Sequence, residues 1–254
     1  MFTIQYRDEV RERIISKAKS DCRIVSAAVI GSYAQGTVDR WSDIDLTFGV
    51  DESYSTRSLI DSWTDYVLKE FTGIVLFDVQ VGNTIYRVFI LPGCLQVDLS
   101  FSPASEFGAM GPHFKLLYGR QYEKPQYGKK NEKWQTQPQP TQEMFGYMVH
   151  HILRARFCAE RNKLWQAEFW ISETRNYALK LACISRGLNA DYGRGFDDLP
   201  NDILSSFKDA YVKELSKNEI LRVIKVIITG LPNISNEVKK LSFNLNHILN
   251  ELSS

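Results

Sequence analysis

Two aspartates separated by one residue lie at the start of an apolar run in the first fifth of the chain. Asp43 and Asp45 flank Ile44, and the run continues to Val50. In a strand, alternate side chains point to the same face, so the two carboxylates project together while Ile44 faces a core. Adjacent carboxylates repel each other unless a cation lies between them, and an oxygen-preferring ion such as Mg²⁺ suits them. The pair predicts a strand with one buried face and one metal-binding face.

A glycine and a serine end the apolar run that precedes this pair. Ten residues separate Ser32 from Asp43, and Gly31 stands directly before Ser32. A strand that ends in Gly-Ser can place backbone N–H groups and a hydroxyl around a phosphate, because glycine lets the backbone approach closely. Alone, Gly-Ser is usually a turn and Asp-x-Asp a solvated strand edge. Asp98, inside a later apolar run, supplies a third carboxylate if the two strands are neighbours.

Residue periodicity divides the chain into a mixed part and a helical part. Apolar spacing in the first part predicts helices over 6–19 and 55–71 and strands over 23–30, 43–50, 74–81, 84–91 and 95–101. The second part predicts helices over 141–162, 164–187, 200–217, 218–231 and 236–252. We therefore expect an α+β fold, in which a mixed sheet with flanking helices is followed by an all-α C-terminal bundle.

The stretch between these parts is rich in proline, glutamine and basic residues, and little in it can form a core. The expected organisation is a sheet domain over 1–120, a linker over 121–140 and a helical domain over 141–254. We expect the basic residues of the linker to be solvated rather than bound to phosphates.

Charge and composition exclude several classes of protein. The 254 residues carry a net charge of +1, which gives no overall attraction to nucleic acid or to an anionic membrane. The four cysteines contain no CxxC pair, so buried free thiols in a reducing compartment are expected. The charged N-terminus does not fit a signal peptide. Together these features predict a cytoplasmic protein, and its oligomeric state stays open.

The ordered set of Gly31-Ser32, ten residues, Asp43-Ile44-Asp45 and a distant strand aspartate resembles the polymerase-beta-type nucleotidyltransferase superfamily. The resemblance covers roughly the first 120 residues. It implies that Asp43 and Asp45 bind Mg²⁺, and that Gly31 and Ser32 bind a nucleoside triphosphate. It also implies that Asp98 is a metal ligand or general base.

The overall plan resembles the smaller bacterial enzymes that adenylylate antibiotics, in which a helical bundle follows an α/β domain. The resemblance implies Mg²⁺-dependent transfer of a nucleoside monophosphate, with AMP from ATP expected, to a hydroxyl of a small molecule such as an aminoglycoside or lincosamide. The alternative is a regulatory or antitoxin-type relative that modifies or binds a partner protein. The acceptor and the nucleotide preference stay open.

One predicted helix, 164–187, carries two polar stripes on an otherwise apolar surface. Lys180 and Arg175 are candidates for contact with a nucleotide phosphate, and Glu168 and Glu173 are alternatives to Asp98 as the general base. The competing interpretation is an exposed face with ion pairs within the helix.

Overall fold

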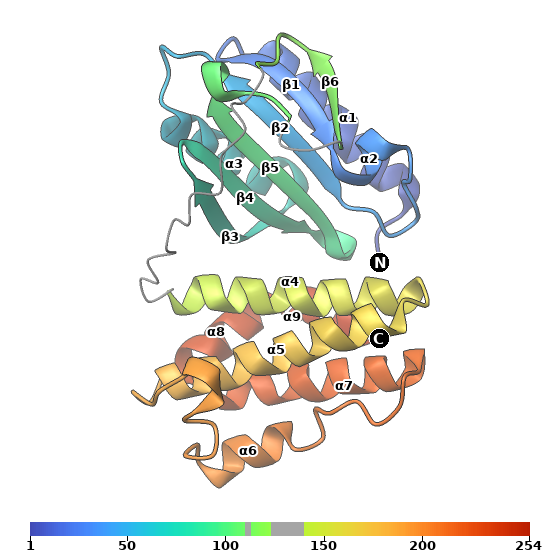
Figure 1. Cartoon of the computed structure of the whole chain (residues 1–254), viewed down its shortest axis with the longest axis vertical. Coiled ribbons are helices and arrows are strands. Elements are labelled where there is room, and N and C mark those ends of the chain that lie inside the picture. The colour runs from blue at the N-terminus through green and yellow to red at the C-terminus, as the bar shows by residue number, and fades with distance from the viewer. Residues whose placement is uncertain (110–112, 123–139) are drawn as a thin grey trace. The chain divides into compact units, whose positions relative to one another are not determined.

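The computed structural model describes residues 1–109, 113–122 and 140–254, and these belong to two compact units, Met1–Gln137 and Pro138–Ser254 (Figure 1). Almost all of the predicted linker, 121–140, lies outside the described residues. The α+β prediction is confirmed, because a mixed sheet with helices forms the first unit and helices form the second. Within the described ranges, no helix is long and apolar enough to cross a membrane.

The first unit is built on a six-stranded sheet in the order β3-β4-β5-β2-β1-β6. Its strands are β1 (Ile24–Ile30), β2 (Ile44–Val50), β3 (Ile74–Val81), β4 (Thr84–Leu91), β5 (Leu95–Pro103) and β6 (Phe114–Tyr118). Strands β2 and β5 pair in parallel, whereas the other neighbours are antiparallel. The central parallel pair brings together two segments that are far apart in the sequence.

Two long helices cover one face of this sheet, α1 (Ile4–Ser20) and α3 (Thr56–Phe71) (Figure 1). The indole of Trp63, on α3, lies 5.1 Å from the ring of Phe48 on β2 and 5.5 Å from that of Phe101 on β5. All three side chains are fully buried. Because side chains alternate along a strand, residues one or three positions away from Phe48 on β2, or from Phe101 on β5, point to the sheet face opposite α3. The opposite sheet face is therefore the one available for a polar site.

The second unit contains six helices among the described residues: α4 (Thr141–Glu160), α5 (Leu164–Ile184), α6 (Asn201–Phe207), α7 (Lys217–Gly230), α8 (Asn236–Asn244) and α9 (Asn246–Ser253). The two predicted helices at 200–217 and 236–252 are shorter than expected. Helix α6 ends at Phe207, and Ser216 instead caps α7 by accepting a hydrogen bond from the Glu219 N–H. Near the end of the chain, Leu245 separates α8 from α9 with a non-helical φ of −101° and ψ of 10°.

The structure also contains elements that the residue pattern does not predict. A five-residue helix, α2 (Gly31–Gln35), follows β1, and the edge strand β6 pairs with β1. Neither segment is long enough to show a clear apolar period. One thiol departs from the expectation as well, because Cys22 is exposed whereas the other three cysteines are buried.

Candidate functional site

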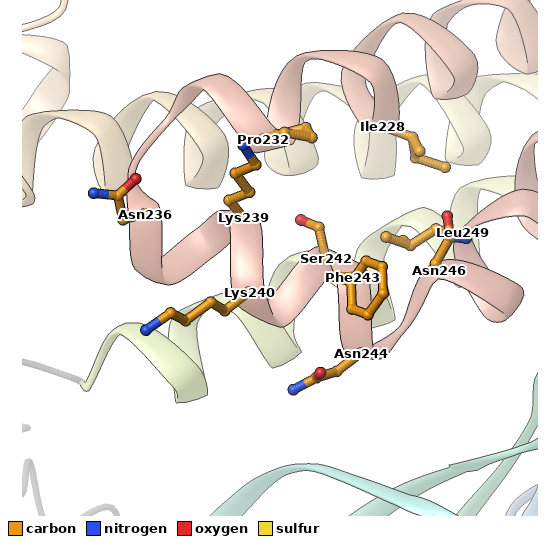
Figure 2. A pocket seen from close by; sticks show the side chains of 10 residues that line it. All are labelled: Ile228, Pro232, Asn236, Lys239, Lys240, Ser242, Phe243, Asn244, Asn246 and Leu249. Carbon is orange, nitrogen blue, oxygen red and sulfur yellow. The ribbon is translucent and has the colours of Figure 1, made fainter.

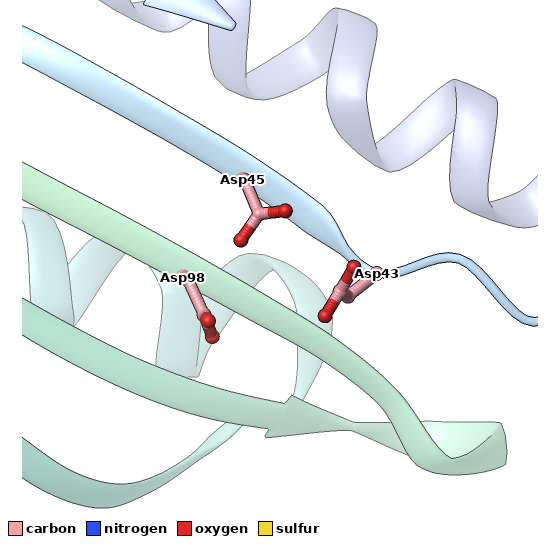
Figure 3. Close-up of side chains that lie close together, drawn as sticks. All are labelled: Asp43, Asp45 and Asp98. Carbon is pink, nitrogen blue, oxygen red and sulfur yellow. The ribbon is translucent and has the colours of Figure 1, made fainter. Parts of the chain in front are cut away.

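Three carboxylates converge at one end of the parallel strand pair (Figure 3). Asp45 on β2 lies directly opposite Asp98 on β5, and Asp43 stands just before the first residue of β2. Each side chain offers one oxygen, and the three oxygens lie within 4.8 Å of one another. All three residues are half-buried. A hard divalent cation that binds oxygen ligands fits this donor set.

A buried amide holds the Asp98 carboxylate in place. Gln96 is 2% exposed and precedes Asp98 by two positions, so both side chains point to the same face of β5. Its Nε2 donates to both carboxylate oxygens, at 2.9 and 3.0 Å. The sequence analysis did not identify this residue. Its polar side chain two places before an aspartate in an apolar strand was the available signal.

The Gly-Ser bend lies beside the Asp45 carboxylate. Gly31 has a φ of +63°, and a methyl group built on its Cα would overlap Asp45 Oδ2 and lie 3.3 Å from Cγ. Ser32 is the second residue of the short helix α2, and its buried Oγ has no hydrogen-bond partner among the described residues. The structure thus brings Gly31 next to the acidic group, with a free buried hydroxyl one residue away.

Helix α1 holds the segment that carries the bend. The guanidinium of Arg11 lies 3.8 Å from the ring centroid of Tyr33, which is on α2. The Tyr33 hydroxyl donates to Asp8 Oδ1 at 3.1 Å, and Arg11 Nη1 donates to the same oxygen at 3.0 Å. This arrangement connects α2 to a long helix, so the position of Ser32 depends on α1.

A second contact from α1 fixes the loop before Asp43. Arg7 is only 3% exposed, and its Nη1 donates to the backbone carbonyl of Asp39 at 2.6 Å. The Asp39 carboxylate in turn accepts hydrogen bonds from Trp41 N and Ser42 Oγ, at 2.9 and 3.0 Å. The buried guanidinium therefore positions the last residues before the acidic pair, and the sequence analysis did not identify it.

The candidates on helix α5 belong to the second unit and have partners there. Arg175 donates to the carbonyl of Ala210 at 3.2 Å, and its guanidinium lies 4.3 Å from the Tyr211 ring centroid. Lys180 Nζ lies 5.5 Å from the centroid of Tyr177. Their contact with a nucleotide stays a prediction.

The two alternative bases also have neighbours on their own helix. Glu168 accepts from the hydroxyl of Ser172 at 2.7 Å, and Glu173 accepts from Asn176 at 3.4 Å. Both contacts are hydrogen bonds to neutral side chains, and both glutamates are half-buried. The choice among Asp98, Glu168 and Glu173 as general base stays open.

The helical unit contains a cavity of its own, of about 680 Å³, beside α8 and α9 (Figure 2). Lys239 and Lys240 line it together with the exposed ring of Phe243, and no carboxylate is among its lining residues. It therefore lacks the acidic groups that a divalent cation needs. The groups that suit metal chemistry lie in the first unit.

Comparison with known proteins agrees with this location. Residues 7–82 match the family model described as "Nucleotidyltransferase domain". The matched segment includes Gly31, Ser32, Asp43 and Asp45, whereas Asp98 lies beyond it. A comparison with curated proteins found no match.

Among solved structures, an aminoglycoside 6-adenyltransferase from Bacillus subtilis is similar to this chain at 12% sequence identity and a TM-score of 0.37. The alignment covers 94% of this chain and 95% of that one.

Proposed function

We propose that this protein transfers a nucleoside monophosphate from a nucleoside triphosphate to a hydroxyl group of a small molecule, because residues 7–82 match the nucleotidyltransferase domain. ATP is the expected nucleotide, and AMP is the expected transferred group. The observation that carries the proposal is the convergence of Asp43, Asp45 and Asp98, whose oxygens lie within 4.8 Å of one another.

The acidic group suits magnesium. Asp43, Asp45 and Asp98 would hold the ion through carboxylate oxygens, the ligands that Mg²⁺ prefers in proteins. When bound, Mg²⁺ polarises phosphoryl oxygens and offsets the negative charge that develops during transfer. Asp45 and Asp98 are direct register partners on adjacent parallel strands, and this proximity supports the assignment of both as ligands.

The other groups of the site suit binding of the triphosphate. Ser32 Oγ is buried without a partner among the described residues, so a phosphate oxygen would satisfy its hydroxyl. Gly31 leaves the backbone open to close approach and leaves room for the Asp45 carboxylate. We assign both residues to nucleotide binding, with Lys180 and Arg175 as further candidates for phosphate contact.

The chemical step is an in-line displacement at the α-phosphorus. The acceptor oxygen forms a new P–O bond, the bond between the α-phosphorus and its bridging oxygen breaks, and pyrophosphate leaves. The acceptor proton passes to a carboxylate, for which Asp98 is one candidate. Glu168 and Glu173 are the alternatives.

We assign acceptor binding to the helical domain, 141–254. The small-molecule class is proposed from the two-part plan, with an antibiotic such as an aminoglycoside or lincosamide as the first acceptor to test. The regulatory alternative predicts a different acceptor, namely a partner protein.

Label transfer tests the proposed function. The purified chain would be incubated with Mg²⁺ and labelled nucleoside triphosphates, with an antibiotic panel and with a cell extract as separate acceptor sources. We expect label on a small molecule, and loss of transfer in Asp43→Asn. The exposed Asp65→Asn is the matched control, since it removes a charge on α3 outside the acidic group.

Label on a protein would support the regulatory alternative instead. Transfer that persists undiminished in Asp43→Asn would contradict the assignment of the metal ligands. No transfer of any nucleotide by the wild-type chain to any of these acceptors would contradict the proposed activity.

A further inference from the structure

A second cavity, of about 260 Å³, lies on the sheet beyond the acidic group, and hydroxyl-bearing side chains line it. We name it the hydroxyl cavity after the residues Thr47, Thr84, Tyr86, Ser100 and Ser102. Gly31 also lines this cavity. The hydroxyl cavity therefore begins at the residue that packs against the Asp45 carboxylate.

Strand register places the hydroxyl cavity on the same face as the carboxylates. Thr47 and Ser100 each follow an acidic ligand by two positions on β2 and β5, and they are register partners. Tyr86 on β4 is the partner of Ser100 on its other side. Because residues two apart on a strand share a face, the hydroxyls continue the row that Asp45 and Asp98 begin.

The hydroxyls of these side chains line the cavity, and none of their oxygens is fully buried. Ser100, Ser102 and Thr84 are 3%, 2% and 6% exposed. No described residue forms a hydrogen bond with their side-chain oxygens, or with those of Thr47 and Tyr86. These hydroxyls are therefore accessible from the cavity, and a polar group that enters it can form hydrogen bonds with them.

The lining also defines the charge of the ligand. Among the described residues that line the hydroxyl cavity there is one histidine, His113, and no lysine, arginine, aspartate or glutamate. Burial raises the pKa of Tyr86, so its phenol stays a neutral donor near pH 7. Ile30 and Phe114 add apolar walls. These features suit a neutral ring system with several hydrogen-bonding groups.

We propose that the hydroxyl cavity binds the nucleoside part of the nucleotide, with its hydroxyls directed at the ribose and base. This inference rests on the proposed function, which places the phosphates at Ser32 and the acidic group. The cavity shares Gly31 with that phosphate site and extends from the acidic group along β2 and β5. A nucleotide anchored by its phosphates would reach the cavity with its uncharged end.

Binding of two ligands separates the nucleoside contribution from that of the phosphates. Isothermal titration of the full chain would compare Mg-ATP with Mg-tripolyphosphate, which has the phosphate chain and no nucleoside. In the double variant Thr84→Val/Ser100→Ala, which removes two hydroxyls at nearly constant volume, we expect Mg-ATP to bind about tenfold more weakly. Tripolyphosphate binding should not change.

Ser20→Ala/Ser62→Ala is the matched control, because both of these hydroxyls lie on exposed positions of α1 and α3. Thermal unfolding would verify that both double variants fold as the wild type does. We expect the control to bind Mg-ATP and tripolyphosphate like the wild type.

Unchanged Mg-ATP affinity in Thr84→Val/Ser100→Ala would overturn the inference and leave the proposed function standing. An equal loss for both ligands would also overturn it, since the hydroxyls would then act on the phosphates. A raised KM for the acceptor with unchanged Mg-ATP affinity would assign the cavity to the acceptor instead. If the wild-type chain binds neither ligand, the proposed function fails and this inference fails with it.

Discussion

Gly31 packs against the carboxylate of Asp45, so that the backbone of the bend and the side chain of the neighbouring strand occupy adjoining space. A Cβ on residue 31 would overlap Oδ2 of Asp45. The φ of +63° at this position also lies in the left-handed region, which favours glycine. Glycine is therefore required here both for the backbone conformation and for the position of a proposed metal ligand.

Replacement of Gly31 should reduce activity far more than stability. Gly31→Ala costs about 1–2 kcal/mol for the left-handed backbone, and its methyl group displaces the Asp45 carboxylate. A displacement of about 1 Å at a reacting site lowers kcat/KM by about a hundredfold. Gly36→Ala is a matched control, since its φ is +70° and a Cβ there would meet no atom within 4 Å. Equal kcat/KM values in the two variants, measured by label transfer, would contradict the role of Gly31.

Magnesium should stabilise the first unit through the acidic group. A ligand at about a hundred times its Kd raises the free energy of unfolding by about 2.7 kcal/mol when it binds only the folded state. We expect Mg²⁺ to raise the Tm of the wild type and of the control Asp65→Asn. Asp45→Asn and Asp98→Asn should show little increase, because each loses one of the three converging carboxylates. Thermal unfolding at several Mg²⁺ concentrations measures the increase in Tm. If Asp98→Asn shows the same increase as the wild type, Asp98 is not a ligand.

Much of the fold was predictable because the local patterns agree with the tertiary contacts. Strand β4, for example, occupies the predicted range 84–91, and Ser55 caps α3 where the helix was expected to begin. Helix α2 and strand β6 were missed. Their segments are short, and their structure depends on neighbours that are distant in the sequence, such as Arg11 on α1 and the edge of β1.

The candidate site, like the fold, was predictable from the sequence only in part. The convergence of the three aspartates was inferred from strand alternation together with one assumption about strand pairing, and the parallel pairing of β2 with β5 confirms that assumption. Arg7 and Gln96 could not be ranked from the sequence, because their importance follows from burial and from hydrogen bonds to a loop and to Asp98. The hydroxyl cavity was missed for a related reason, since serine and threonine in a strand have no distinctive spacing.

Asp21 should give the first unit an acid-sensitive contribution to stability. Hydrogen bonds from Arg23 lower the pKa of the Asp21 carboxyl to about 2, and the indole N–H of Trp63 adds a further hydrogen bond at 3.1 Å. The unfolded chain has the ordinary value of 3.8. The ionised carboxylate therefore stabilises the fold fully above about pH 4, and this contribution is lost as the pH falls toward 2.

Asp21→Asn should lower the free energy of unfolding by about 1–2 kcal/mol at pH 7. The difference from the wild type should shrink between pH 4 and pH 2. Urea unfolding across this range measures it, with Asp65→Asn as the control on α3. A difference that stays constant with pH would show that the Asp21 carboxyl is not held ionised by Arg23.

His151 should make the helical unit sensitive to milder acid. The imidazole is 9% exposed, and its ring centroid lies 5.0 Å from that of Trp170 and 5.1 Å from that of Tyr177. Burial lowers the pKa of His151 to about 4, from the ordinary 6.5. The pKa of His150 is lowered to about 3 by burial, with smaller contributions from the charges of Arg154 and His151. Between about pH 4 and pH 6.5, both imidazoles are mainly neutral in the folded protein, whereas in the unfolded chain they are mainly protonated.

The free energy of unfolding should therefore be highest above pH 6.5 and should fall as the pH drops toward 4. His151→Phe keeps a ring of similar size beside Trp170 and removes the titrating group, so it should reduce the pH dependence by about 2 kcal/mol over this interval. In this variant, His150 should still make the free energy of unfolding depend on pH. Urea unfolding followed by helical circular dichroism at pH 7, 5.5 and 4.5 measures the effect, with the exposed His247→Gln as the control. If His151→Phe and the wild type lose stability equally between pH 7 and 4.5, protonation of the buried imidazole is not what opposes folding in acid.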